Sequence, residues 1–170
     1  MNIIDKFSLV GKNAFVFGGS GTIGKSIVNN FLELKVKVHS LDLNSANDNL
    51  TENSNLFNFI EYDVTKFSSM KSSIQNLVSK YGVPDIFINA SYPRSSSWLN
   101  SSRENMKPES FRENIDLHLN SYCISSKLIA DEMVTNKKNG SIILLGSIYG
   151  HIGQDPNLYD ETNLEENMIQ

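Results

Sequence analysis

Short apolar runs alternate along this chain with longer stretches in which apolar residues recur every three or four positions. The short runs are rich in β-branched and aromatic residues and predict strands at 13–18, 35–43, 56–64, 84–90 and 141–147. The helical spacing predicts three helices, at about 22–34, 67–82 and 109–136. This alternation is typical of βαβ units, so we expect an α/β fold whose parallel sheet has helices on both faces.

Two polar segments separate these elements, and the pattern fades after residue 147. Residues 44–55 are predicted as a loop or a short helix, and 91–107 as a long serine-rich loop. A loop of the second kind is usually functional or disordered. No convincing helix or strand pattern follows the last predicted strand. At 170 residues, the chain is expected to form a single domain, 1–170.

Composition narrows the classes of partner. Charged residues make up 20% of the chain and the formal net charge is −4, so we expect no nucleic-acid partner. No run approaches the roughly 18 apolar residues of a membrane span, so no membrane partner is expected. The single cysteine, Cys123, excludes an intrachain disulfide and a cysteine zinc cluster, and its helical pattern predicts a small core residue. No metal site is predicted, and a cytoplasmic location fits.

A glycine cluster lies where the first predicted strand turns into the first helix. The segment "FVFGGSGTIGKSI" (15–27) contains Gly18, Gly19, Gly21 and Gly24. Glycines there let the backbone approach a pyrophosphate at the N-terminus of the helix. The cluster alone is weak evidence, but the strand before it and the amphipathic helix after it strengthen the prediction of a dinucleotide site.

An acidic residue follows at the distance expected for ribose recognition. Asp42 ends the second predicted strand, 24 positions after Gly18. A carboxylate there accepts hydrogen bonds from a ribose 2′-OH and repels a 2′-phosphate, which favours NAD over NADP. The alternative is an ordinary solvated aspartate at a strand end.

With these features, the chain resembles the short-chain dehydrogenase/reductase family over nearly its whole length. The family's loop usually reads Thr-Gly-x-x-x-Gly-Ile-Gly, whereas "FGGSGTIG" (17–24) has Phe17 for the threonine and Thr22 for the middle glycine. The resemblance implies a Rossmann-like, doubly wound parallel sheet in a three-layer α/β/α arrangement. Because the family adds two further strands, the sheet is expected to be incomplete at its C-terminal edge.

Further motifs extend the resemblance around the cofactor. "YDVT" (62–65) is similar to the family's Asp-Val beside the adenine, and "INAS" (88–91) to its Asn-Asn-Ala-Gly beside the adenosine ribose. On the residues alone, Asp63 or Thr65 capping the next helix is an equal alternative. The resemblance implies these cofactor-binding residues: Gly18, Ser20, Gly21, Thr22, Ile23, Gly24, Asp42, Leu43, Asp63, Val64, Asn89, Ala90 and Ser91.

On the catalytic side, the family uses Ser, Tyr and Lys, usually with an Asn from the long helix. Ser147, in "SIILLGSIYG", matches the serine that holds the substrate oxygen; the alternative is an ordinary strand-end serine. "DLHLNSY" (116–122) is similar to the asparagine segment, but places His118 at the family's position and Asn120 two residues later. His118 is expected to polarise or relay a proton, or else to be a buried, hydrogen-bonded histidine.

The family's Tyr-x-x-x-Lys is missing from the expected place. Gly153 stands four positions after Tyr149, and Asn163 four after Tyr159; "YDVTK" (62–66) lies on the adenine side and is interpreted as chance. "NASYPR", "DLHLNSYC" and "LLGSIYGHIGQDPNLYDETNLEENM" resemble the family branch associated with bacterial surface sugars, including flagellin modification and legionaminic-acid-type synthesis. In that branch Tyr and Lys directly follow "EENM", so the chain is expected to be truncated before its base.

These patterns lead to two hypotheses. The first is an NAD(P)-dependent oxidoreductase that transfers hydride at a hydroxyl or carbonyl carbon of a sugar or nucleotide-sugar, inactive or weak in this chain. The second is a non-catalytic NAD-binding or regulatory module. Arg94 and Arg103 are candidates for binding a substrate anion, with a solvated loop as the alternative. The resemblance also implies a homo-oligomer in the full-length family, with the helix at 109–136 as part of its dimer interface.

Overall fold

Five parallel strands form one sheet in the computed structural model, in the order β3-β2-β1-β4-β5. The structure describes residues 7–45, 55–98, 106–153, 155 and 157. Most of the polar segment 44–55, Arg103 and the chain from residue 158 onward lie outside this description. The strands are β1 (Asn13–Phe17), β2 (Lys37–Asp42), β3 (Phe57–Glu61), β4 (Ile86–Asn89) and β5 (Ser141–Leu144).

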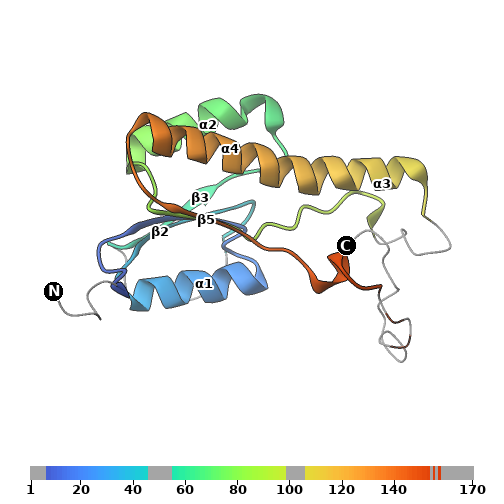
Figure 1. Cartoon of the computed structure of the whole chain (residues 1–170), viewed down its shortest axis with the longest axis horizontal. Helices are drawn as coiled ribbons and strands as arrows, with labels where there is room; N and C mark the ends of the chain where they lie inside the picture. Colours follow the sequence, from blue (N-terminus) through green and yellow to red (C-terminus); the bar gives the residue numbers. More distant parts are fainter. Residues whose placement is uncertain (1–6, 46–54, 99–105, 154, 156, 158–170) are drawn as a thin grey trace.

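Helices cover both faces of the sheet, which confirms the predicted doubly wound, three-layer fold. One face carries α1 (Thr22–Glu33), and the other carries α2 (Phe67–Tyr81) and the long helical rod of the chain (Figure 1). The rod, predicted as one helix at 109–136, consists of α3 (Pro108–Ile115), a π-helical turn η4 (Asp116–Asn120) and α4 (Ser121–Thr135). The predicted strand 141–147 ends at Leu144, and a 3₁₀ turn, η5 (Ile148–Gly150), follows it.

Two apolar cores lie on opposite sides of the sheet, and β1 contributes to both. Phe15 and Phe17 point into the core that packs against α2 and α4, whereas Ala14 and Val16 point into the core that packs against α1. All four side chains are fully buried. A central parallel strand is buried on both faces, which explains why β1 has a continuous apolar run instead of alternation.

The rod buries only part of the face that its apolar pattern predicts, because Ile129 lies in the core but several other apolar residues do not. Its buried positions include Ser121 and Ser125, whereas Phe111 is 42% and Leu119 57% exposed. Serine tolerates this burial because its hydroxyl bonds to a carbonyl of the preceding turn, as Ser121 does to His118 (2.9 Å). Small side chains also let the rod approach the sheet closely. The prediction that Cys123 is a core residue is therefore wrong, because its thiol lies on the exposed face.

β5 lies at the edge of the sheet in the described part of the chain. It pairs with β4 through Ser141 to Leu144, and its other edge has no described partner strand. Ile143 and Leu144 are 43% and 44% exposed, far more than the residues of the central strands. β5 is therefore the edge strand of the sheet within the described ranges.

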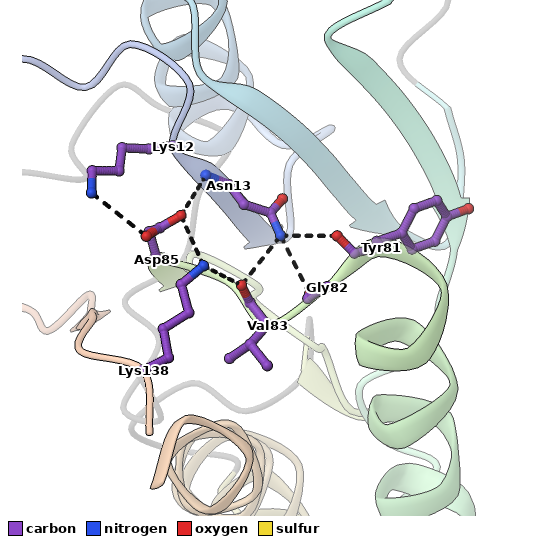
Figure 2. Close-up of polar contacts among 7 residues, drawn as sticks. All are labelled: Lys12, Asn13, Tyr81, Gly82, Val83, Asp85 and Lys138. Atoms are coloured by element: carbon purple, nitrogen blue, oxygen red, sulfur yellow. Dashed lines mark hydrogen bonds and ion pairs between the residues drawn. The ribbon is translucent and has the colours of Figure 1, made fainter. Parts of the chain in front are cut away.

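A polar network ties the amino-terminal ends of the strands together (Figure 2). The carboxylate of Asp85 accepts the backbone N–H of Asn13 (2.9 Å) and pairs with the ammonium groups of Lys138 (3.1 Å) and Lys12 (3.6 Å). Lys138 also donates to the carbonyl of Val83 (2.8 Å). Burial opposes the charge of Asp85, but the Asn13 and Lys138 contacts outweigh it and lower the pKa of this carboxyl.

Replacing Asp85 should destabilise the fold measurably. Asp85→Ala leaves the Asn13 N–H without its acceptor in a partly buried site, and it leaves the Lys138 ammonium with only the Val83 carbonyl. We expect the free energy of unfolding to fall by about 2 kcal/mol in urea denaturation. Asp131→Ala removes an exposed ion pair with Lys127 on α4 and should cost only about 0.4 kcal/mol. Equal losses in the two variants would contradict the role given to the network.

Candidate functional site

The carboxyl ends of the strands meet at one edge and bring several candidate residues to it. Phe17 of β1 pairs in register with Leu41 and with Asn89, and Asn89 pairs with Leu144. The chain leaves β1 toward β2 on one side and β4 lies on the other, so the strand order reverses at β1. Ligands of open α/β sheets bind outside the carboxyl ends of the strands at this reversal.

Gly18 brings the glycine loop into direct backbone contact with the segment after β4. It has φ +74°, and a Cβ on it would lie 2.5 Å from the nitrogen of Ser91 and 2.6 Å from the carbonyl carbon of Ala90. Gly24 likewise has no room for a side chain, because a Cβ would collide with the carbonyl oxygen of Gly18. Only glycine fits at these two positions, so the loop is held tightly against its neighbours.

The N-terminus of α1 is open where this loop ends. No side chain caps the first turn of α1, and Gly21, Thr22 and Ile23 are exposed. The first backbone N–H groups of a helix lack partners within the helix and attract anions. The residues present therefore fit a pyrophosphate, and Thr22 leaves this end of the helix accessible.

The carboxylate of Asp42 is oriented toward the glycine loop. One oxygen accepts the backbone N–H of Ser20 (3.0 Å) and the other accepts that of Leu43 (2.8 Å). Asp42 is only half-buried, and Leu43 is 57% exposed. Each carboxylate oxygen keeps a further lone pair, so the group is able to accept hydroxyl donors from a ligand beside the loop.

Asp63 organises a turn at the end of β3. Its carboxylate accepts the backbone N–H (2.9 Å) and the hydroxyl (2.6 Å) of Thr65. Burial opposes the charged form, but these bonds and Lys66 (3.8 Å) outweigh it and lower the pKa of Asp63. The capping alternative is wrong, because α2 begins after Lys66 without a side-chain cap. Val64, beside it, is buried in the core on the α2 side.

The segment after β4 is fixed to α4 by buried hydrogen bonds. The side-chain oxygen of Asn89 accepts both the N–H (3.1 Å) and the hydroxyl (2.6 Å) of Ser91, and its amide donates to Ser125 (3.3 Å). Asn89 is fully buried. The Tyr122 hydroxyl donates to the carbonyl of Ser91 (3.0 Å), and burial raises the pKa of this phenol. Ala90 and Ser91 are thereby held beside the glycine loop.

His118 lies in the π-helical turn and packs against the same segment. Its ring meets that of Tyr92 edge to face, with centroids 4.4 Å apart. Burial lowers the pKa of His118, and a hydrogen bond to the Pro93 carbonyl opposes this shift only in part. The Nε2 atom is buried without a hydrogen-bond partner among the described residues. His118 is thus a neutral, half-buried histidine, and π-helical turns are frequent at functional sites.

Asn120 and Ser147 form local hydrogen bonds instead of joining His118. The Asn120 amide donates to Asp116 (3.0 Å) along the rod. The Ser147 hydroxyl, exposed just after β5, accepts the N–H of Tyr149 (3.2 Å) at the start of η5. The structure therefore brings the glycine loop, Asp42 and Asn89 to one edge. Ser147 follows β5, and no contact in the described ranges joins Asn120 or Ser147 to that group.

The sequence prediction missed an aromatic cluster beside His118. The indole N–H of Trp98 donates to the Tyr92 hydroxyl (3.1 Å), and the guanidinium carbon of Arg94 lies 4.4 Å from the Trp98 ring centroid. The sequence feature that could have predicted this cluster is the pair of aromatic residues on either side of Arg94 in the serine-rich loop. Among the described residues, no three His, Cys, Asp or Glu side chains group as potential metal ligands.

The family model described as short chain dehydrogenase matches residues 12–157, which include every motif at this edge. The chain belongs to the short chain dehydrogenase family. It is 27% identical over 166 residues to post-translational flagellin modification protein A of Campylobacter coli, covering 94% of this chain and 64% of that protein. It is 25% identical to glucose 1-dehydrogenase 2 of Bacillus subtilis, covering 91% and 61%. The predicted resemblance to the family and its flagellin-modification branch is confirmed.

Solved structures support the same fold. A short chain dehydrogenase of Leptospira borgpetersenii with bound NAD+ has a TM-score of 0.79 and 26% identity, covering 96% of this chain and 61% of that one. ElxO with NADPH bound has a TM-score of 0.72 at 21% identity, covering 85% and 59%, and shows the fold alone. The chain thus spans about three fifths of its relatives' length. In the described ranges, each helix is too short or too polar to cross a membrane.

Proposed function

We propose that this chain binds NAD(H) and serves hydride transfer at a hydroxyl or carbonyl carbon of a sugar or nucleotide-sugar. The observation that carries the cofactor choice is the carboxylate of Asp42, held at the end of β2 by the Ser20 N–H beside an open helix N-terminus. A carboxylate there accepts ribose hydroxyls and repels a 2′-phosphate, which favours NAD over NADP. The name of the glucose dehydrogenase supports a sugar substrate.

Each residue at the edge has a place in the proposal. Bound NAD supplies the hydride chemistry. The glycine loop and the N-terminus of α1 bind its pyrophosphate, Asp42 its ribose, and Asp63 and Asn89 flank the adenosine. Ser147 holds the substrate oxygen. His118, neutral and with an Nε2 that has no hydrogen-bond partner among the described residues, polarises or relays a proton, and Asn120 assists from the same rod. We place this reaction in the cytoplasm, with a homo-oligomer as the family's usual assembly.

The 170-residue polypeptide should bind the cofactor better than it turns over. No Tyr with a Lys four positions later follows Ser147 in its sequence, and loss of a general acid or base removes roughly 10²–10⁴-fold of rate. The second candidate, a non-catalytic NAD-binding module, predicts no turnover at all. Following NADH absorbance with NAD+ and a panel of aldoses should give turnover far below about 1 s⁻¹. Turnover at an ordinary rate would contradict both weak catalysis and the second candidate.

Neutralising Asp42 should change the choice of cofactor. Asp42→Asn keeps an acceptor for Ser20 but loses the charge, so NADH affinity should fall about 10-fold and NADPH affinity rise about 10-fold. Fluorescence titration measures both. Glu61→Gln is the matched control, because Glu61 pairs with Asp42 in the β-sheet register and is exposed. If Asp42→Asn leaves the NADH to NADPH ratio unchanged, Asp42 does not select the cofactor.

A further inference from the structure

The loop after β4 folds into a compact cluster that has no part in the cofactor site proposed above. We define the aromatic–arginine cluster as Tyr92, Arg94 and Trp98. The Trp98 backbone N–H donates to the Ser95 carbonyl (3.2 Å), which turns the indole back toward Tyr92. The indole N–H then bonds to the Tyr92 hydroxyl (3.1 Å), and Arg94 lies over the indole ring. These contacts hold the three side chains in one arrangement without a ligand.

The cluster lies beside the edge where substrate must meet the cofactor. Tyr92 follows β4 by three residues, directly after the segment that contacts Gly18. Two contacts fix the start of this loop to the rod: the hydrogen bond from Tyr122 to Ser91 and the packing of His118 on Tyr92. Figure 1 shows the segment after β4 leaving the carboxyl edge of the sheet and passing along the α3 side of the rod. The cluster therefore lies near the β4 end of this edge, on the other side of β1 from Asp42 of β2.

Arg94 has the properties of an anion receptor. It is exposed, and no carboxylate pairs with it in the described ranges. Its guanidinium carbon lies 4.4 Å from the centroid of the Trp98 ring, which restrains a side chain that is otherwise mobile. A guanidinium uses its face in an aromatic contact and keeps its N–H donors in its plane, where they match a carboxylate or a phosphate in a bidentate manner.

The aromatic partners suit a sugar next to that anion. Tyr92 is 44% exposed, so part of its surface is available to a ligand, and Trp98 contacts both Tyr92 and Arg94. An aromatic ring offers a flat apolar surface that packs against the C–H face of a sugar, and the hydroxyl at its rim adds a polar contact. A cation and an exposed ring side by side thus select a ligand that has both an anionic group and an apolar face.

We propose that the aromatic–arginine cluster is a substrate subsite that binds the carboxylate or phosphate of an acidic sugar. This inference rests on the proposed sugar oxidoreductase function and specifies its substrate class. Arg94 binds the anionic group, Trp98 positions Arg94, and Tyr92 packs against the sugar ring. The neutral form of the same sugar lacks the principal contact and binds weakly.

Calorimetric titration of the NADH-loaded chain tests the subsite with three matched probes: glucose, glucuronate and glucose 6-phosphate. The two anionic probes should bind at least about 10-fold more tightly than glucose, and their ratio tells whether a carboxylate or a phosphate is preferred. Arg94→Gln should abolish this advantage, and Trp98→Leu should reduce it. Arg112→Gln, which changes an exposed arginine of α3 paired only weakly with Glu109 (4.0 Å), should leave it intact.

The outcomes separate this inference from the cofactor proposal. Equal binding of glucose and its anionic forms, including no binding of any probe, overturns the subsite. An advantage that survives Arg94→Gln, or that Arg112→Gln also removes, overturns it as well. NADH titration of the same samples reports on the cofactor site independently. If NADH binds and the probes show no difference, the subsite fails while the dehydrogenase proposal stands.

Discussion

Gly18→Ala should destabilise the chain by about 3 kcal/mol and abolish NADH binding. At φ +74°, a non-glycine residue costs about 1 kcal/mol, and overlap with surrounding atoms costs typically 1–3 kcal/mol more. The overlap falls on the backbone of Ala90 and Ser91, which cannot rotate away as a side chain can. Relief requires the glycine loop to part from the segment after β4, which displaces both sides of the proposed cofactor site.

Gly11→Ala provides the matched control for this prediction. Gly11 has nearly the same backbone conformation, φ +75°, but no atom lies within 4 Å of the position that a Cβ would occupy. The free energy of unfolding of Gly11→Ala should fall only by the backbone conformational cost, about 1 kcal/mol, and the variant should keep NADH binding. Urea denaturation and NADH titration of the two variants measure the difference. Equal stability losses would mean that close contact with Ala90 and Ser91 is not what requires glycine at position 18.

Stability should fall steeply as the pH drops from about 6.5 to 4, because of His39. This side chain is fully buried in β2 between the rings of Phe15 and Tyr81, and neither ring nitrogen has a hydrogen-bond partner among the described residues. Burial first, and the charge of Lys37 second, lower its pKa from 6.5 to about 4. The unfolded chain therefore binds the proton first. The contribution of His39 to the free energy of unfolding is complete above pH 6.5. Below that pH it declines by about 1.4 kcal/mol per pH unit, or about 3 kcal/mol in total by pH 4.

His39→Leu removes the titrating group and should flatten most of this pH dependence. A smaller slope should remain, because the pKa of His118 is also lowered by burial. His151→Gln, which changes an exposed histidine, should leave the profile unchanged. Thermal unfolding between pH 4 and 7 gives the comparison. Parallel profiles for the unchanged chain and His39→Leu would show that the buried imidazole does not cause the acid sensitivity.

The elements that the sequence predicted correctly are those in which local pattern and tertiary burial agree. β1 is buried on both faces and reads as an uninterrupted apolar run, and α1 has a single apolar stripe that packs on the sheet. The local sequence of each element is therefore enough to predict it. The glycine loop was recognisable for the same reason, since close backbone contact at Gly18 and Gly24 excludes other residues. Boundaries differed by one to three residues, as at β5, where pairing ends at Leu144.

The features that the sequence did not predict depend on contacts between distant segments. The sheet-facing side of α4 begins with serines whose hydroxyls bond within the helix, so apolar spacing predicted the burial of Ile129 correctly but that of Cys123 wrongly. His39 appeared as one polar residue in a strand, and only its neighbours Phe15 and Tyr81 reveal a buried neutral imidazole. The aromatic–arginine cluster forms through a turn in a loop without periodicity.

Titration of the unchanged chain with NADH and, in parallel, with NADPH tests the central claim most directly. The claim is that the glycine loop and Asp42 form an NAD site at the carboxyl edge of the sheet. The account predicts saturable enhancement of NADH fluorescence, with NADH bound at least about 10-fold more tightly than NADPH. Equal binding of both, tighter binding of NADPH, or no binding of either by the folded chain would contradict it.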